Sequence, residues 1–277
     1  MRRGAALAAL LALSACGGTA PAPQGAAPAR ERPRVMSLNP CVDAILVAVA
    51  DPGQILSISH YSHDPRASSM PVALARHFPA NAETAEEVVA LRPDLVLLGP
   101  HVAPATQDRI RGLRIRIETV GVPATIAESR DQILRIARAV GHEARGRALL
   151  ARIDAALAAA APPAGAAPVP ALIREGGGLV PGQGTLADEL LARTGFRNMS
   201  AAYGLAMWDI LPLEPLIARP PALLLTDRSR PDPGAAALAR VPGLRIADFP
   251  DRLLQCAGPT LIDAAGRLAR IRKESRA

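Results

Sequence analysis

Hydrophobic and polar positions follow two alternating periods from residue 34 onward. Short apolar runs, typical of buried strands, alternate with stretches in which apolar residues recur every three or four positions, typical of amphipathic helices. This order predicts an α/β lobe with a mostly parallel sheet over residues 33–124. Its expected strands are residues 34–38, 55–59, 95–99 and 115–120, and its expected helices are residues 42–50, 84–91 and 106–111.

Two helical patterns, residues 126–140 and 143–161, come next and are separated by Gly141. The second repeats apolar residues at Leu149, Leu150, Ile153 and Leu157, which is the spacing of one helix face. At the usual rise per residue this helix would be about 28 Å long, enough to act as a strut. The Pro and Gly residues at 162–165 then break the pattern. Residues 125–162 are therefore a predicted helical linker.

The strand and helix alternation starts again after the linker and runs to the C-terminus. This predicts a second α/β lobe over residues 168–277, and hence two Rossmann-like lobes joined by a single long helix. Its expected strands are residues 171–173, 222–226 and 244–246, and its expected helices are residues 185–193, 213–218 and 261–271.

An internal repeat supports the prediction of two lobes. Residues 86–98 align with residues 214–226: in each copy a glutamate, Glu86 or Glu214, opens a short helix, and a proline seven positions later precedes an apolar strand. Helix, proline and strand are a common order in α/β proteins, and a carboxylate in the first turn stabilises a helix. A purely structural role for both glutamates therefore stays open.

The N-terminus has the pattern of an export signal. Arg2 and Arg3 precede an apolar run over residues 5–13, which is too short to span a bilayer. Residues 13–16 resemble the lipobox of bacterial lipoproteins, which predicts cleavage before Cys16 and its lipidation. Residues 1–16 are then the lipoprotein-type signal segment, in which Cys16 becomes the first residue of the mature chain. The alternative is a signal peptide without lipidation that has a cysteine near its cleavage site. Residues 17–32, rich in Ala, Pro and Gly, form a flexible tether.

Composition narrows the classes of function. The net charge is +7, and the basic residues are almost all arginine, with Lys273 the only lysine. The arginines are scattered along the chain, whereas a nucleic-acid site needs a concentrated basic stripe. No nucleic-acid partner is therefore expected. Aromatic residues make up only 2% of the chain, so each one is a candidate for a specific role.

Several segments, in this order along the chain, resemble one family: the periplasmic binding proteins that carry cobalamin, siderophores and haem to ABC importers. The resemblance implies two α/β lobes with the ligand in a shallow, preformed cleft between them. It also implies a monomer that is not an enzyme, has no resident cofactor, works in the periplasm and has the permease and ATPase complex of the inner membrane as its partner. The segments that carry the resemblance are residues 34–40, 59–65, 91–96, 184–191 with Gly195 and Asn198, and 208–214.

The same resemblance implies roles for individual residues. Tyr61 and Trp208 correspond to aromatic residues on the cleft of the family's cobalamin member, and flat rings suit a corrin or porphyrin. Tyr203 is a weaker candidate in the same loop region as Trp208. Tyr61, His60 or His63 is able to ligate the metal of such a ligand. The alternatives are that Trp208 packs a loop and that the histidines are solvated.

Glu86 and Glu214 correspond to the glutamates that dock this family onto arginines of the permease. The repeat thereby acquires a function. Because the alignment is good to about one residue, Glu87 is an alternative to Glu86.

Cys41 and Cys256 are an even pair in an oxidising compartment. Cys256 stands where a relative can have an arginine that contacts the ligand, and Cys41 follows the first strand on the cleft side. Three hypotheses remain: a disulfide that clasps the lobes, two thiols that contact the ligand or its metal, and inert buried thiols. This departure also weakens the assignment of the ligand, for which a cobalamin-like corrinoid comes first, a ferric siderophore second and haem third.

A binder of bare Zn or Mn is one alternative function. His60 and His63 have the spacing of a ligand pair on a turn, and His77 and His101 belong to the same lobe. A single pair of histidines at this spacing is weak evidence, so the chelate binder is preferred.

An exported hydrolase of unrecognised type is the other alternative. The glycines at residues 176–178 and 182–184 complete neither a phosphate-binding loop nor a dinucleotide fingerprint, and Gly-x-Ser-x-Gly does not occur. A turn that leads into a helix capped by Thr185 is the preferred interpretation of the second glycine segment.

Overall fold

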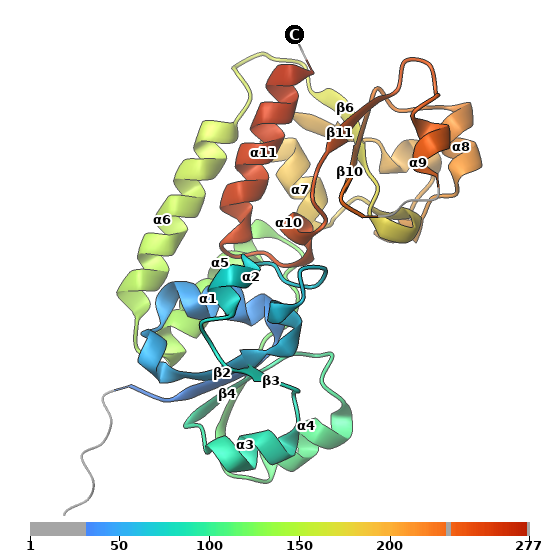
Figure 1. Ribbon diagram of the computed structural model, residues 1–277. Helices are drawn as coiled ribbons and strands as arrows, with labels where there is room; N and C mark the ends of the chain where they lie inside the picture. Colours follow the sequence, from blue (N-terminus) through green and yellow to red (C-terminus); the bar gives the residue numbers. More distant parts are fainter. Residues whose placement is uncertain (1–31, 231–233, 276–277) are drawn as a thin grey trace, which may run out of the picture. The chain divides into compact units, whose positions relative to one another are not determined.

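Two parallel β-sheets form the framework of the computed structural model (Figure 1), which describes residues 32–230 and 234–275. The predicted signal peptide, Cys16 and the tether up to residue 31 lie outside the described residues. The first sheet has the order β3-β2-β1-β4-β5, and each neighbouring pair is parallel. Its strands are β1 (Val35–Leu38), β2 (Ile55–Ser59), β3 (Ala80–Asn81), β4 (Leu95–Leu98) and β5 (Arg116–Thr119).

Alternation along the strands of this first sheet gives it two buried faces. Val35, Leu95 and Leu97 point into one apolar cluster, whereas Met36, Val96 and Leu98 point into another. Helices α3 and α4 contribute to the second cluster and so cover what we call the outer face of this sheet. The helices of this lobe are α1 (Pro40–Val49), α2 (Val72–Ala75), α3 (Ala85–Leu91) and α4 (Pro104–Arg111), with the 3-10 helices η1 (Pro52–Gln54) and η2 (His60–His63).

The second sheet has the order β11-β10-β6-β8 and is also parallel, with a separate antiparallel pair β7-β9. These two sheets confirm the predicted fold class of two α/β lobes. The strands are β6 (Val169–Ile173), β7 (Leu179–Pro181), β8 (Phe196–Asn198), β9 (Trp208–Ile210), β10 (Leu223–Thr226) and β11 (Arg245–Asp248). The helices are α7 (Leu186–Arg193), α8 (Leu213–Ala218), α9 (Ala235–Leu238), α10 (Arg252–Gln255) and α11 (Thr260–Glu274), with η3 (Gly176–Gly178) and η4 (Ser200–Tyr203).

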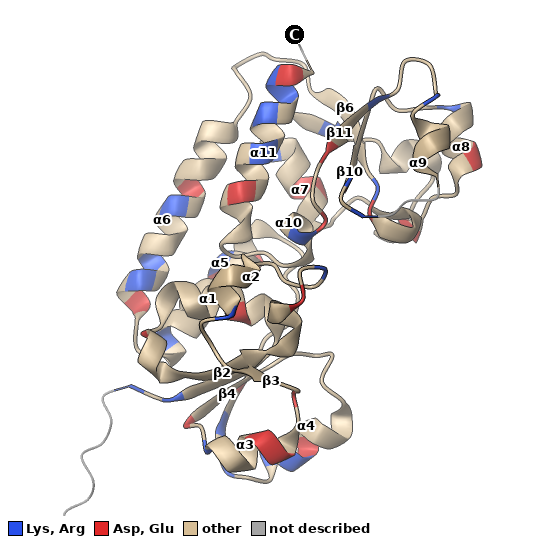
Figure 2. Cartoon of the chain, in the orientation of Figure 1, with Lys and Arg blue, Asp and Glu red and all other residues tan. Residues whose placement is uncertain are grey.

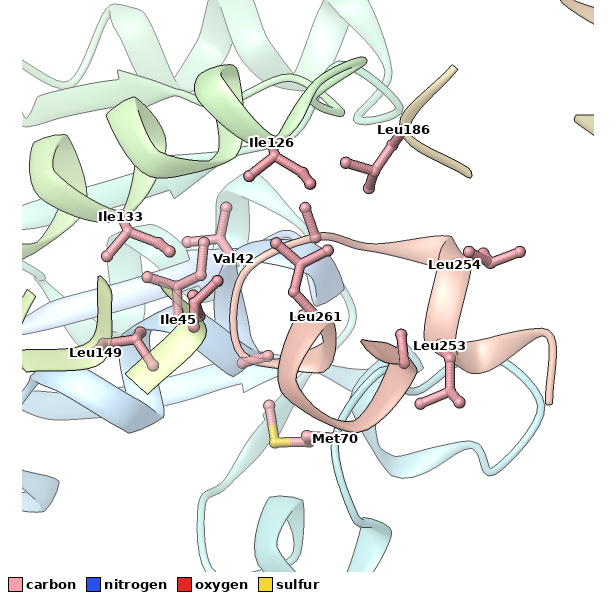
Figure 3. Close-up of a cluster of buried hydrophobic side chains, with 14 of the residues drawn as sticks. Val42, Ile45, Met70, Ile126, Ile133, Leu149, Leu186, Leu253, Leu254 and Leu261 are labelled. Carbon is pink, nitrogen blue, oxygen red and sulfur yellow. The ribbon is translucent and has the colours of Figure 1, made fainter. Parts of the chain in front are cut away.

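Helices α5 (Ile126–Ala139) and α6 (Glu143–Ala160) connect the lobes, and α6 packs on α5 and α11. One continuous apolar cluster runs from α1 through these helices to α7, α10 and α11, as Figure 3 shows for Ile45, Ile133 and Leu254. Arg272 of α11 donates hydrogen bonds to the carbonyls of Ala160 and Ala161, at the end of α6. The lobes therefore share a core, and α6 is anchored at its C-terminus to the second lobe.

The internal repeat corresponds to equivalent positions in the two sheets. Val88 of α3 and Leu216 of α8 are both buried in the cluster on the outer face of their own sheet. The aligned strand residues agree as well, because Val96 and Leu224 join those outer clusters. Helix α8 thus occupies in the second lobe the place that α3 occupies in the first (Figure 1).

The short helices α2, α9 and α10 and the short strands β3, β7, β8 and β9 were not predicted from the sequence. Strands of two or three residues carry no readable period, and they exist because distant partners pair with them. Within residues 32–230 and 234–275, no helix has the length and apolar character needed to cross a membrane.

Candidate ligand-binding cleft

Tyr61 lies on η2, the turn that follows the carboxyl end of β2. Ser59 begins this turn, and its Oγ accepts a hydrogen bond from the Tyr61 amide at 3.3 Å. Asp43 of α1 holds the turn through its Oδ2, which accepts hydrogen bonds from the Ser59 amide at 3.0 Å and from Ser62 Oγ at 2.6 Å. One carboxyl group therefore fixes the backbone on both sides of Tyr61.

The side chain of Asp43 is fully buried. Burial raises the pKa of Asp43 to about 8, although the hydrogen bonds from Ser62 and Ser59 oppose the shift. The Oδ1 atom makes no hydrogen bond within the described part of the chain. A protonated carboxyl group avoids the cost of a buried charge, so Asp43 holds the turn in its neutral form at neutral pH.

Two imidazole rings flank Tyr61, which is 43% exposed. The His60 ring centroid is 4.1 Å from that of Tyr61, and the His101 ring meets it edge-on at 6.4 Å. His101 Nε2 lies 3.1 Å from Oε2 of Glu83, and the other oxygen of Glu83 accepts a hydrogen bond from Ser59 Oγ at 2.5 Å. The turn and its aromatic neighbours therefore form one connected network.

Gly99 and Glu83 show that this network is tightly packed and constrains the backbone. A Cβ on Gly99 would lie 2.4 Å from Cε1 of His101, so the imidazole packs where only glycine leaves room. Glu83 has a left-handed backbone, with φ of +62°, which is uncommon for a residue with a side chain. Such a conformation persists only where neighbouring contacts hold it, and it is common at functional sites.

His60 and His63 do not face each other as a metal pair. His60 Nδ1 is 3.1 Å from the carbonyl of Asn81, and His63 Nε2 is 3.1 Å from the carbonyl of Ala75. His77 Nδ1 lies 3.2 Å from the Leu74 carbonyl. No group of three or more His, Cys, Asp or Glu side chains in residues 32–230 and 234–275 is arranged to hold a metal ion.

Cys41 and Cys256 form a disulfide with a Cα–Cα distance of 5.0 Å. It joins the first turn of α1 to the segment between α10 and α11. Gln255 Nε2 also donates to the carbonyl of Arg66 at 3.3 Å, so side chains and backbone of both lobes meet here. Of the three hypotheses for these cysteines, the structure has the disulfide that joins the lobes, and Cys256 is buried.

A cavity of about 690 Å³ opens between the lobes beside this junction. Arg66 contributes from the first lobe, Arg230 from the loop after β10 of the second, and Arg252 from the start of α10, which follows β11. Among the lining residues, three carry guanidinium groups and one, Asp227, carries a carboxylate, so we call this the basic cavity. Two of the arginines also have acidic partners behind the lining, because Arg66 pairs with Asp64 and Arg230 with Asp251. The other lining residues of the cavity are Pro65, Gly176, Gly177, Ser229 and Pro250.

A buried and a half-buried carboxyl group of the second lobe, Asp251 and Glu175, adjoin this basic cavity. Asp251 Oδ2 accepts hydrogen bonds from the Gly176 amide and from Arg230 Nη1, each at 3.2 Å. Burial raises the pKa of Asp251. Burial, together with the charge of Asp251, raises the pKa of Glu175 to about 7. The raised pKa of Glu175 therefore reduces the negative charge beside the cavity near neutral pH.

Trp208 lies in a second, smaller cavity of about 180 Å³, which both lobes also line. It is 48% exposed and begins β9, whose register pairs Trp208 with Pro181 of β7. Met207 and Val122, both exposed, lie with it. A Cβ on Gly182 would lie 2.0 Å from the Ala206 carbonyl oxygen. Only glycine therefore lets the backbone at residue 182 pack against the segment that precedes Trp208.

Tyr203 does not join Trp208 in this cavity. Its hydroxyl donates a hydrogen bond to the Arg219 carbonyl at 2.6 Å, and the Arg219 guanidinium lies 5.8 Å from the ring centroid. The ring packs on the outer apolar cluster of the second lobe. Burial raises the pKa of the Tyr203 phenol. These contacts hold the Tyr203 side chain against its own lobe.

The predicted docking glutamates lie on the outer helices of the two lobes, and Figure 2 shows acidic residues on both α3 and α8. Glu86 and Glu214 are exposed. Glu86 pairs with Arg109 of α4 at 2.9 Å, whereas Glu214 makes no ion pair with any of the described residues. Glu87 instead caps α3, because its carboxylate accepts hydrogen bonds from the Ala82 and Thr84 amides. Glu87 is therefore engaged within its own helix, whereas the Glu86 carboxylate lies at the surface.

The arginines of the basic cavity were missed as a group in the sequence. Arg66, Arg230 and Arg252 each follow a strand of a parallel sheet by a few residues, and the carboxyl ends of such strands form ligand sites. That position was a usable signal. Thr185 did follow its prediction, because it caps α7 by accepting a hydrogen bond from the Asp188 amide at 3.2 Å.

A cleft between two α/β lobes and a connecting helix agrees with a family model described as periplasmic binding protein, which matches residues 35–258. The chain belongs to the periplasmic binding protein family. No curated protein sequence matches it significantly.

Solved structures of periplasmic binding proteins share this fold. The periplasmic haem-binding protein BhuT, solved with two haems, is 24% identical, with a TM-score of 0.67 over 88% of this chain and 99% of its own. The vitamin B12 binding protein BtuF of Vibrio cholerae is 18% identical, with a TM-score of 0.68 over 89% and 98%. The haem-binding protein RhuT from Roseiflexus sp. RS-1 is 24% identical, with a TM-score of 0.66 over 86% and 98%.

Proposed function

We propose that this periplasmic binding protein captures a metal chelate with acidic groups, of the haem or ferric siderophore class, and delivers it to an ABC permease. The basic cavity between the lobes carries this proposal, because Arg66, Arg230 and Arg252 surround a space of about 690 Å³. Guanidinium groups bind carboxylates and similar anions through paired hydrogen bonds. A corrinoid, whose side chains are mostly neutral amides, makes less use of three arginines, so the acidic chelates move ahead of it.

The rest of the cleft suits the apolar and metallic parts of such a ligand. Trp208, Met207 and Val122 offer an apolar surface to a flat ring system or an aliphatic arm. Tyr61, between His60 and His101, has a phenol oxygen that is a suitable ligand for ferric iron. The iron belongs to the cargo, and the protein supplies orientation and charge.

The remaining parts of the proposal concern delivery. Glu86 and Glu214 dock the protein onto basic side chains of the permease, whose ATPase drives import. The protein is a monomeric carrier, not an enzyme, and works in the periplasm. A lipid on Cys16 anchors it to a membrane, with residues 17–32 as the tether.

Titration of the exported protein tests the ligand class. Haemin, ferric citrate, a catecholate ferric siderophore and cyanocobalamin are added in turn, and the fluorescence of Trp208, the only tryptophan, reports binding. We expect quenching at one ligand per protein by an acidic chelate and no turnover of it. Tight binding of cyanocobalamin alone would restore the corrinoid, and absence of binding by all four would contradict the chelate carrier.

Substitutions test the role of the arginines. Arg66→Gln and Arg252→Gln should each weaken binding of the acidic chelate by ten-fold or more, since each removes a charge-assisted hydrogen bond. Arg240→Gln, on an exposed position outside the cleft, is the matched control and should bind as the original protein does. Equal affinities in all three variants would argue against the basic cavity as the site.

Cell fractionation tests the anchor. We expect the exported protein to sediment with membranes and Cys16→Ala to move it to the soluble fraction or block its processing. Mass spectrometry of the N-terminal peptide then identifies the lipid. An unmodified Cys16 in the purified protein would contradict lipidation.

A further inference from the structure

Each lobe presents a glutamate and an exposed β-branched aliphatic residue on the same helical turn. In α3 these are Glu86 and Val89, and in α8 they are Glu214 and Ile217. Val89 is 54% exposed and Ile217 is 42% exposed. Residues three positions apart lie on the same side of a helix, so each carboxylate adjoins an apolar side chain at the surface.

The duplication makes this arrangement informative. Single exposed apolar residues are ordinary on a protein surface. Val89 and Ile217, however, occupy the same position of the internal repeat, and the preceding residues Val88 and Leu216 are fully buried in both lobes. Two lobes that share this register present the same pair of an acid and an aliphatic side chain to solvent.

The first lobe adds a groove beside this pair. A cavity of about 410 Å³ lies between α3 and α4 and is lined by Ala85, Glu86, Val89, Arg109 and Leu113. The Glu86–Arg109 ion pair crosses from one helix to the other at its edge. Because both side chains are mostly exposed, the pair is weak enough for another cation to replace Arg109.

We propose that Val89 and Ile217 are apolar contacts in the two docking surfaces, and that the partner presents, once for each lobe, a basic side chain beside an aliphatic one. This inference rests on the proposed delivery to a permease. A duplicated surface on one chain fits a partner with two equivalent receiving surfaces, as in a symmetric membrane dimer. An anionic lipid surface would bring like charges to Glu86 and Glu214, so a basic partner is favoured.

Binding to the cognate permease in lipid nanodiscs tests this inference with three double variants of the exported protein. The first is Val89→Gln with Ile217→Gln. The matched control is Ala90→Gln with Ala218→Gln, on the exposed positions next along each helix. The reference is Glu86→Ala with Glu214→Ala. We expect affinity to fall ten-fold or more in the first and third variants and to stay within two-fold in the control, while haemin or ferric citrate binding and thermal stability are unchanged in all.

The outcomes separate this inference from the delivery function. If Val89→Gln with Ile217→Gln binds the permease normally while the glutamate variant does not, the apolar contacts are wrong and docking stands. If all variants bind normally, both are wrong. A photo-crosslinking residue at position 89 or 217 in intact cells should form an adduct with a permease subunit. An adduct with only lipid or with a second copy of this chain would overturn the proposal.

Discussion

Cys41 and Cys256 link the two lobes covalently at the junction between them. Their separation of 215 residues in sequence spans almost the whole folded chain. A cross-link of this kind restricts the unfolded chain and also limits how far the lobes can part. The cleft is therefore held by the disulfide, by α6 and by a shared core, which favours a preformed site.

Loss of the disulfide should destabilise the protein. We expect Cys41→Ala with Cys256→Ala to lower the free energy of unfolding by about 2–4 kcal/mol. Urea denaturation of the oxidised protein, the reduced protein and the double variant measures this. Two reactive thiols in the untreated, denatured protein would show that the bond does not form.

The neutral form of Asp43 predicts a dependence of stability on pH. The pKa of Asp43 is about 8 when folded and 3.8 in an unperturbed chain, so between these values unfolding releases a proton. The contribution of Asp43 to stability is therefore complete below about pH 4 and is lost as pH rises toward 8, by up to about 1.4 kcal/mol per unit.

Asp43→Asn should remove this dependence while keeping the turn of Tyr61, since an amide resembles a protonated carboxyl group. Asp43→Ala should lose the hydrogen bonds to Ser59 and Ser62 and weaken binding of the chelate. Denaturation at pH 5, 6, 7 and 8 compares the original protein with both variants. If the free energy of unfolding changed with pH in the same way in the original protein and in Asp43→Asn, Asp43 would be ionised in the folded protein.

Glu175 should make ligand affinity depend on pH near neutrality. Its pKa is raised to about 7 by burial and by Asp251, so it gains a negative charge as pH rises through that value. The added negative charge offsets the positive charge of Arg230. It should therefore weaken binding of ferric citrate or haemin several-fold between pH 6 and 8. Glu175→Gln should bind equally at both pH values. If the variant kept the full change in affinity, another group would be responsible.

Arg109 should limit docking by the first lobe. Because Arg109 pairs with Glu86 at the surface, Arg109→Gln should change the free energy of unfolding by less than about 1 kcal/mol. It should also raise affinity for the permease several-fold, since Glu86 no longer has a partner within the chain. Arg111→Gln, which removes the neighbouring pair with Asp108, is the control. Weaker permease binding by Arg109→Gln would instead make Arg109 a direct contact.

The sequence predicted the regular elements best where local signals were strong. Strand β2 and helix α8 have the predicted bounds, and Thr185 caps α7 as expected. Apolar runs and capping residues act over a few positions, so they can be recognised without a structure. The repeat of Glu86 and Glu214 was visible for the same reason, because each copy is a continuous segment.

The cleft was predicted less well, because it is assembled from distant segments. Tyr61 and Trp208 were singled out, but the basic cavity depends on Arg66 meeting Arg230 and Arg252 across the lobes. The hydrogen bond from Tyr203 to the Arg219 carbonyl was also not foreseen, because the two residues belong to different elements. Neither relationship leaves a periodic pattern in the sequence.

The sequence by itself determined the alternation of strands and helices, the duplicated lobes and the residues able to do chemistry, since each of these depends on local pattern. The tertiary structure decided that Cys41 and Cys256 are bonded, that Asp43 is buried beneath the turn of Tyr61, and that three arginines share one cavity. Bond formation, burial and net charge depend on distances between segments far apart in the chain, and only the packing of the fold sets those distances.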